Sequence, residues 1–403
     1  MAQLQPLSDR GNMVEYVETQ LDTIKERPLC DVDSLVLSWL SYWRLSPDAR
    51  ETSTSRGAEI GALYDAKAFG SMTTVVSDAA SCRHLLAALV ASPRFRRMRI
   101  ANYVEDTNEE SEKQFSAMTL RLPGNVTYVA FRGTDSTVVG WKEDFNLAFE
   151  QAIPSQLAAT AYLEKVARLT RGPLYVGGHS KGGNLAVYAA MNCKPAVRER
   201  IVAAFSHDGP GFTEEAMAVP SWAEASHLIH KTLPRSSVIG MLFERQEKDF
   251  SVVESTSVGI MQHDPFSWVV NGTAFCVVKE LSLGASLFDQ GLNDWVSNMS
   301  SAEREHFIET LFSIFKAGGE PTFASLADNW TETVPKMLGA LADMSGEDRD
   351  MLGRVVSALV RSVVPSVSDV LDRADTDPIT PGFQLPDLLS MFKKPELTEA
   401  KDA

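Results

Sequence analysis

The sequence contains few cysteines, and none of them belongs to a paired motif. Only four occur among 403 residues, and Cys30, Cys82, Cys193 and Cys276 are scattered without any C-x-x-C spacing. A zinc site or a dense disulfide framework would need closely spaced cysteines. We therefore expect all four to be small core residues, and we expect no metal and no other cofactor.

Long apolar runs and an excess of basic residues are also missing. No segment reaches the roughly 18 consecutive apolar residues of a membrane span, and residues 1–6 do not begin a signal peptide. With 38 Lys and Arg against 53 Asp and Glu, the formal net charge is −15, which repels phosphate backbones and anionic lipids. The sequence argues against nucleic-acid and membrane partners and predicts a cytoplasmic protein.

The first part of the chain changes from a helical to a strand-like pattern near Met98. Apolar residues at spacings of three and four predict two helices in 11–45, the second capped by Asp33, and a further helix in 74–92. Residues 122–125 have the composition of a hairpin turn between two β-rich runs. The expected strands are 98–107, 113–121 and 126–131.

From residue 131 onwards, predicted helices alternate with predicted strands. Strands that are separated by helices form βαβ units, so we expect an α/β protein with a mostly parallel central sheet covered on both faces. The expected helices are 139–148, 154–169, 181–192 and 213–219. The expected strands are 173–177, 201–206 and 227–233, followed by a strand pair at 238–243 and 250–254.

Beyond residue 283 the strand pattern stops, and apolar residues recur at helical spacing behind Ser-x-x-acid capping patterns. We therefore expect an α/β domain over 1–283 that includes the N-terminal helices. A helical extension is expected over 284–375, and a loose polar tail over 376–403.

A candidate nucleophile lies between an apolar strand and an Ala-rich helix. Residues 174–186, LYVGGHSKGGNLA, contain G-x-S-x-G with Ser180 at its centre. A nucleophile elbow needs small residues, here Gly178 and Gly182, because the turn from strand to helix is tight and strains the serine backbone. The amide of Lys181, at the positive end of the following helix, would stabilise an oxyanion, while the Lys181 side chain is expected to be solvated.

A second segment, residues 131–145 with the sequence FRGTDSTVVGWKEDF, follows the buried strand. Together with G-x-S-x-G it resembles the class 3 lipases over about residues 98–268. The resemblance implies an α/β-hydrolase fold and an oxyanion hole in which Thr134 donates its amide and hydroxyl, whereas a helix cap is the alternative role for Thr134. It also implies that Trp141 and Asp144 are structural.

Three further segments are similar to a bacterial family of unknown function that is related to these lipases. The resemblance to this closer family implies the same fold and little about substrate. The segments are 31–38, 207–212 and 262–268.

His263 is the expected general base. It follows the last predicted strand and directly precedes Asp264-Pro265, a cap and proline that predict a helix start and would place the imidazole on a loop at the sheet edge. We expect His227 and His230 to be core or surface residues, because they lie in a strand-like run.

The acid of the expected triad is harder to assign. The position at which class 3 lipases carry it falls near residues 236–237, which are both serine here. Asp208 is the first choice because it directly follows the predicted strand 201–206 and precedes a Gly-Pro-Gly turn; an Asx turn is its alternative role. Glu244 and Asp249 remain competing candidates for the acid.

These residues predict a serine hydrolase that acts on a carboxylic ester or thioester, with a small-molecule ester or acyl compound as substrate. Ser180 would attack the acyl carbon, His263 would transfer protons, Asp208 would orient the imidazole, and Thr134 and Lys181 would stabilise the oxyanion. Two alternatives remain: a catalytically idle protein that binds a protein partner through its C-terminal helices, and an enzyme that hydrolyses peptides or amides.

Overall fold

The structure is a computed structural model. It describes residues 10–46, 50–74, 76, 78–108, 113–134, 152–212, 214–237, 239–242, 250–257 and 259–282, together with a few positions between 310 and 339. The chain divides into two compact units, Met1–His306 and Phe307–Ala403. The expected helix at 139–148, the helical extension and the tail lie outside the described residues, apart from those few positions. The fold below is that of the first unit.

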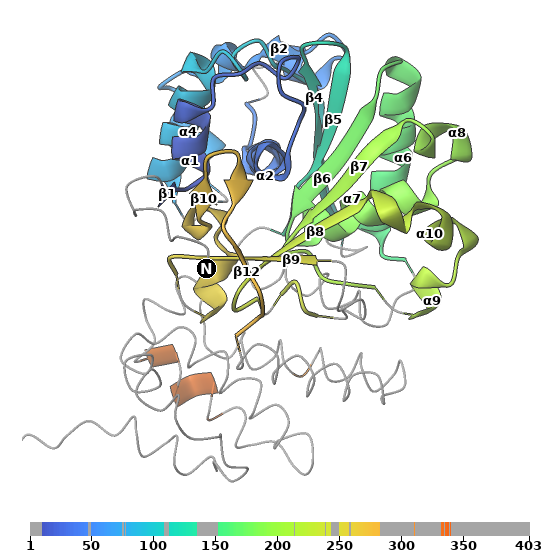
Figure 1. Ribbon diagram of the computed structural model, residues 1–403. Helices are drawn as coiled ribbons and strands as arrows, with labels where there is room; N and C mark the ends of the chain where they lie inside the picture. Colours follow the sequence, from blue (N-terminus) through green and yellow to red (C-terminus); the bar gives the residue numbers. More distant parts are fainter. Residues whose placement is uncertain are drawn as a thin grey trace, which may run out of the picture. The chain divides into compact units, whose positions relative to one another are not determined.

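A nine-stranded mixed sheet forms the centre of this unit (Figure 1). Its strand order is β12-β9-β8-β7-β6-β5-β4-β3-β2, and the five strands from β9 to β5 are parallel, whereas the flanking strands pair antiparallel. The predicted α/β-hydrolase fold is confirmed, with the parallel arrangement confined to the central strands. The strands are β2 (Ala58–Glu59), β3 (Arg99–Asn108), β4 (Lys113–Leu122), β5 (Val126–Phe131), β6 (Leu174–His179), β7 (Ile201–His207), β8 (Ile229–Pro234), β9 (Phe250–Val253) and β12 (Val277–Val278).

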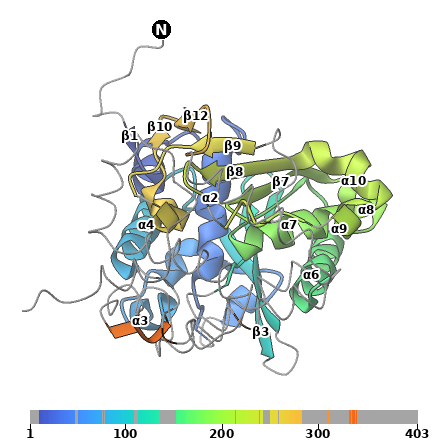
Figure 2. The same ribbon diagram turned by 90° about the horizontal axis from the view of Figure 1, so that it is seen from below.

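Helices cover both faces of the sheet (Figures 1 and 2). The N-terminal helices lie on one face and the helices that follow β5 on the other. On the first face are α1 (Met13–Thr19), α2 (Asp31–Trp39), the 3-10 helix η2 (Leu40–Tyr42) and α4 (Ala79–Ala91), with α3 (Phe69–Met72) nearby in the chain. On the second are α6 (Pro154–Leu169), α7 (Lys181–Asn192), α8 (Pro195–Arg198), α9 (Glu214–Met217) and α10 (Pro220–Ala225).

Strand β5 shows why both faces are covered. Tyr128 and Ala130 belong to the core beneath the N-terminal helices, whereas Val129 and Phe131 belong to the core beneath α6 and α7. All four side chains are fully buried. A strand that is apolar on both faces is typical of the interior of a parallel sheet, because helices must remove both faces from water.

The expected hairpin turn is confirmed, since β4 ends at Leu122 and β5 begins at Val126. Gly124 and Asn125 take positive φ angles of 86° and 62° there, which glycine and asparagine tolerate best. The expected strand at 238–243 is wrong where it is described, because residues 239–242 form a turn. The amide of Gly240 in this turn donates to the Asp208 carboxylate. In a strand, the same amide would have donated to a carbonyl of the neighbouring strand.

The N-cap predicted for the second helix lies three residues too late. Helix α2 begins at Asp31, after the N-cap Cys30, and Asp33 lies in its first turn, where its carboxylate accepts from the Cys30 amide at 2.9 Å. The Asp33 carboxylate is fully buried and accepts hydrogen bonds from Arg94 Nε at 2.7 Å, Arg94 Nη2 at 2.5 Å and the Tyr16 hydroxyl at 2.7 Å. Arg94 also donates to backbone carbonyls of the loop before α2, including that of Asp22 at 2.7 Å. The pair therefore holds this loop against the chain that follows α4.

We expect Asp33→Asn to lower the free energy of unfolding by about 3–5 kcal/mol, because the Arg94 guanidinium would lose its counter-charge in a fully buried site. Urea unfolding followed by circular dichroism measures the change. Glu224→Gln is the control, since Glu224 is exposed and its bond to Arg198 is a surface pair, for which a change below about 1 kcal/mol is expected. Equal small effects in both variants would contradict a structural role for the buried pair.

His207, at the end of β7, is a second buried polar residue on the first face. Its Nε2 lies 2.9 Å from Ser34 Oγ, and among the described residues its Nδ1 has no hydrogen-bond partner. Burial lowers the pKa of His207 to about 4 from the ordinary value of 6.5. The imidazole is therefore neutral in the folded protein near neutral pH.

We expect the protein to lose stability as the pH falls from about 6.5 to 4, because over this range the unfolded chain binds a proton at His207 that the folded protein excludes. The contribution is up to about 3 kcal/mol. Urea unfolding at several pH values should show a shallower loss in His207→Gln than in the wild type. An unchanged pH slope in the variant would assign the acid sensitivity to other groups.

Candidate active site

Ser180 occupies a strained turn between β6 and α7. Its φ of 58° and ψ of −136° lie in a region that non-glycine residues rarely adopt. A side chain at Gly178 would clash with the backbone of Gly182, and one at Gly182 would clash with the carbonyl of Phe131. The two flanking glycines therefore allow the start of α7 to lie directly against the ends of β6 and β5.

The end of β7 lies beside this turn. The Ser180 amide donates to the His207 carbonyl at 2.9 Å, and Asp208 follows directly with a φ of 51°. A Cβ atom at Gly209 would lie 2.8 Å from the Ser180 carbonyl oxygen. The turn that carries Asp208 therefore packs closely against the turn that carries the serine.

The Asp208 carboxylate is 1% exposed and both its oxygens have partners. Its Oδ2 accepts a hydrogen bond from His263 Nδ1 at 2.6 Å. Its Oδ1 accepts from Ser237 Oγ at 2.5 Å and from the Gly240 amide at 3.2 Å. Because a carboxylate only accepts, the proton shared with Asp208 lies on His263 Nδ1, and in the neutral ring the lone pair is on Nε2.

His263 lies at the end of the 3-10 helix Gly259–His263, which precedes a second one at Pro265–Ser267. The predicted helix start is confirmed as this second short turn, in which Asp264 Oδ1 accepts from the Phe266 amide at 3.1 Å. Trp268 Nε1 donates to the Gln262 carbonyl at 2.7 Å. The loop that carries the imidazole is thus fixed on both sides of His263.

His179 connects this loop to the N-terminal part of the chain. Its Nε2 donates to the His263 carbonyl at 2.8 Å, and its Nδ1 lies 3.0 Å from the Tyr42 hydroxyl. The two imidazole rings have centroids 4.5 Å apart. Burial, reinforced by the neighbouring His263, lowers the pKa of His179 well below its usual range, so this ring is neutral and the Tyr42 hydroxyl donates to Nδ1.

The expected oxyanion donors border the same turn. Thr134 follows β5 and is 8% exposed, and a Cβ atom at the preceding Gly133 would lie 3.0 Å from Ser180 Cβ. The expectation of a solvated Lys181 side chain is wrong: it is fully buried, and its Nζ donates to the Gln114 carbonyl at 3.1 Å. This contact directs the Lys181 side chain towards β4.

The structure leaves some candidates untested and separates others from the site. His227 is exposed, and His230 Nδ1 lies 3.3 Å from Asp31 Oδ1 at the surface. The candidates that lie outside the described residues are Trp141, Asp144, Glu244 and Asp249.

Sequence reasoning did not find two residues that contact the site. Tyr42 lies in an apolar helical run, where an aromatic residue is more often a core residue, and nothing local marks its bond to His179. Ser237 did carry a signal, because it lies where class 3 lipases have their acid. Its hydroxyl contributes to the same cluster by donating to Asp208.

Two kinds of feature are absent from the part of the chain that the structure describes. Its His, Cys, Asp and Glu residues form no group of three or more that could hold a metal ion. Its helices also include none that is long and apolar enough to cross a membrane.

Among solved structures, the chain is similar to two lipases. A Rhizomucor miehei lipase in its propeptide complex is 12% identical with a TM-score of 0.29, over 43% of this chain and 66% of that chain. The M37 lipase is 13% identical with a TM-score of 0.34, over 52% of this chain and 68% of that chain. The chain thus spans about two thirds of the length of these lipases. No curated protein matches the chain.

A match to a protein family covers more of the chain. The model of a family described as Mbeg1-like matches residues 89–313, which is more than half of the sequence. The matched range includes Ser180, Asp208 and His263. The chain therefore belongs to the Mbeg1-like family.

Proposed function

We propose that this protein is a serine hydrolase that cleaves carboxylic esters or thioesters. The observation that carries the proposal is the hydrogen bond from His263 to the buried Asp208, formed beside a serine in a strained elbow. A buried carboxylate that fixes the tautomer of an imidazole next to a nucleophile is the arrangement that general-base catalysis requires. The proposal is further supported by the Ser180 amide, which donates to the carbonyl of His207, the residue before Asp208.

In the proposed reaction the Ser180 hydroxyl attacks the acyl carbon while His263 Nε2 accepts its proton. Asp208 stabilises the imidazolium through the bond to Nδ1. The amides of Thr134 and Lys181 donate to the oxyanion, and the positive end of α7 adds to this stabilisation. The imidazolium then protonates the leaving group, and water, activated by the same histidine, releases the acid and regenerates the serine.

We expect Ser180→Ala to abolish covalent labelling by a fluorophosphonate and to lower the hydrolysis of p-nitrophenyl esters by about 10³-fold or more, because the nucleophile is removed while the turn is kept. Gel fluorescence measures the labelling, and a chain-length series of esters measures the activity. Ser251→Ala, at an exposed serine of β9, is the matched control and should label normally. A wild-type protein that neither labels nor hydrolyses any ester would indicate a catalytically idle protein.

We expect a graded loss of activity at the acid. Asp208→Asn keeps the shape but removes the charge that fixes the His263 tautomer, so kcat should fall by about 10³–10⁴-fold. Ser237→Ala removes one hydrogen bond to the same carboxylate, and kcat should fall by about tenfold with KM unchanged.

Ser236→Ala is the control for this series, because the Ser236 hydroxyl donates to Ser282 and not to Asp208. It should keep kcat within about twofold. Normal ester hydrolysis by Asp208→Asn would show that Asp208 is not the acid of the triad. Glu244 and Asp249 would then be the remaining candidates.

A further inference from the structure

Asn184 is a buried polar residue of α7 to which the proposed reaction assigns no role. It lies four residues after Ser180, about one helical turn, and its side chain is fully buried. Its Nδ2 donates to the Pro210 carbonyl at 3.2 Å and to the Gly211 carbonyl at 3.0 Å. These two residues belong to the turn that begins at Asp208, directly after β7. The helix that starts beside Ser180 therefore also contacts the turn that carries Asp208.

A second buried amide, that of Gln156 in the first turn of α6, fixes the orientation of Asn184. Gln156 is 3% exposed, and its Nε2 donates to Asn184 Oδ1 at 2.8 Å. Its own Oε1 accepts from the Ile153 amide at 3.1 Å, so reversing the Gln156 side chain would place two donors against each other. Reversing Asn184 would likewise direct its oxygen at two carbonyl oxygens. The Nδ2 group of Asn184 is therefore held towards the turn after β7.

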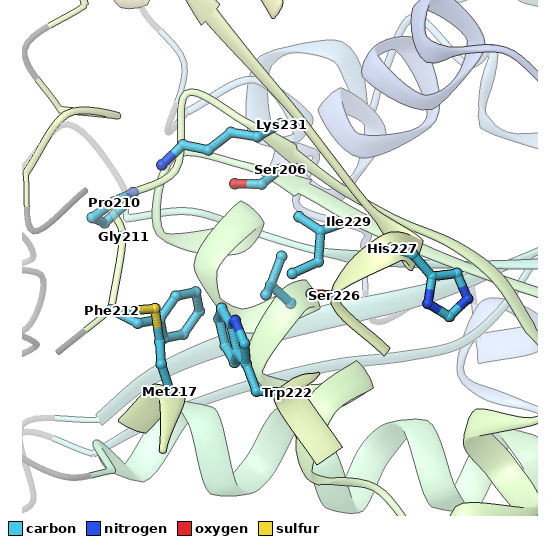
Figure 3. Close-up of a pocket in the computed structure, with 11 residues that line it drawn as sticks. Ser206, Pro210, Gly211, Phe212, Met217, Trp222, Ser226, His227, Ile229 and Lys231 are labelled. Atoms are coloured by element: carbon cyan, nitrogen blue, oxygen red, sulfur yellow. The ribbon is translucent and has the colours of Figure 1, made fainter. Parts of the chain in front are cut away.

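The turn after β7 needs support because its backbone is strained and its packing is incomplete. Asp208 has a φ of 51°, in a region that is unfavourable for residues with a side chain. Pro210 and Gly211 are buried, yet they border a cavity of about 470 Å³ (Figure 3). Atoms that border a cavity lack close neighbours on that side. Hydrogen bonds therefore contribute much of what fixes this segment, namely those from Asn184 and one at 2.7 Å from the Gly211 amide to the Leu242 carbonyl.

Asp208 is held between the sheet and α7. On the sheet side its amide donates to the Thr232 carbonyl of β8 at 2.8 Å. On the helix side a Cβ atom at Gly209 would lie 2.9 Å from the Asn184 backbone nitrogen, so the turn and α7 are in close contact. Loss of the Asn184 side-chain donors would leave two buried carbonyls unpaired, and the turn would have to move to find other partners. Such a movement would also displace the Asp208 carboxylate from His263.

We propose that Asn184 is a positioning residue, which fixes the turn after β7 so that the Asp208 carboxylate stays within hydrogen-bond distance of His263 Nδ1. It acts on the reaction through Asp208. A displacement of about 1 Å in a catalytic group lowers the rate by about 10²-fold. The effect of Asn184 on the rate rests on the proposed function, whereas its effect on the bond between Asp208 and His263 can be measured in a protein that hydrolyses nothing.

We expect Asn184→Leu to lower kcat for p-nitrophenyl esters by about 10²-fold and to keep KM within about twofold, because leucine has a similar volume but no donor. Asn192→Leu is the matched control: Asn192 is exposed at the end of the same helix, and its Nδ2 donates to the Tyr188 carbonyl at 3.0 Å. Its kcat should stay within about twofold of the wild type. In an Asp208→Asn background, Asn184→Leu should change kcat by less than about twofold, since the charge that it positions is absent. A full second loss there would overturn the proposal.

The bond between Asp208 and His263 has a spectroscopic signature of its own. A proton held between imidazole Nδ1 and a buried carboxylate resonates far downfield of the amide protons in NMR spectra, and labelling of histidine with ¹⁵N, together with His263→Gln, identifies it. We expect this resonance in the wild type and in Asn192→Leu, and its loss or upfield shift in Asn184→Leu. A variant that loses only thermal stability and keeps the resonance unchanged would overturn the proposal, and so would a wild type that lacks the resonance.

Gln156→Met is the second variant for the case in which circular dichroism shows that Asn184→Leu does not fold. It keeps both Asn184 donors and removes the group that orients them, so the resonance should shift upfield and kcat should fall by about tenfold. An unchanged resonance in Gln156→Met would then overturn the proposal. A wild type that shows the resonance but hydrolyses no ester contradicts the proposed function alone.

Discussion

The geometry of the candidate site depends on the hydrogen bond between Asp208 and His263. It joins two segments 55 residues apart, and each partner is fixed by different parts of the fold. Asp208 follows a central strand and accepts two further hydrogen bonds on its other oxygen, so its carboxylate cannot rotate without losing them. His263 lies on a loop without a strand of its own, and its position therefore depends on what this loop contacts.

The N-terminal helices provide much of that support. Tyr42, in the 3-10 helix after α2, donates to His179, and His179 donates to the backbone of His263. Helix α2 itself is fixed by the buried pair of Asp33 and Arg94. A series of hydrogen bonds between buried polar side chains favours a single arrangement, because a side chain that moves leaves a neighbouring buried group without its hydrogen-bond partner. The helices before the first long strand are therefore connected to the loop at the sheet edge.

The sequence alone predicts those features that depend only on residues close together in the chain. The Ser180 elbow was recognised because two glycines and a strand-to-helix change are local requirements, and the hairpin at Gly124 and Asn125 followed from turn chemistry in the same way. The buried Lys181 side chain and the turn at 239–242 were not predicted. Both depend on partners distant in sequence: the Gln114 carbonyl for the lysine and the Asp208 carboxylate for the turn.

The position of Asp208, the proposed acid, shows how the same chemical group can come from either of two neighbouring strands in a parallel sheet. Strands β7 and β8 are parallel neighbours, so their carboxyl ends meet at the same edge, and a side chain after either strand reaches the same space. Asp208 follows β7, while Ser237 follows β8, where the resembling lipases carry their acid. The Ser237 hydroxyl donates to Asp208 at 2.5 Å, so the two positions contact one another. A carboxylate at one position and a donor at the other preserve a single negative charge beside His263, whereas two carboxylates at this distance would repel each other.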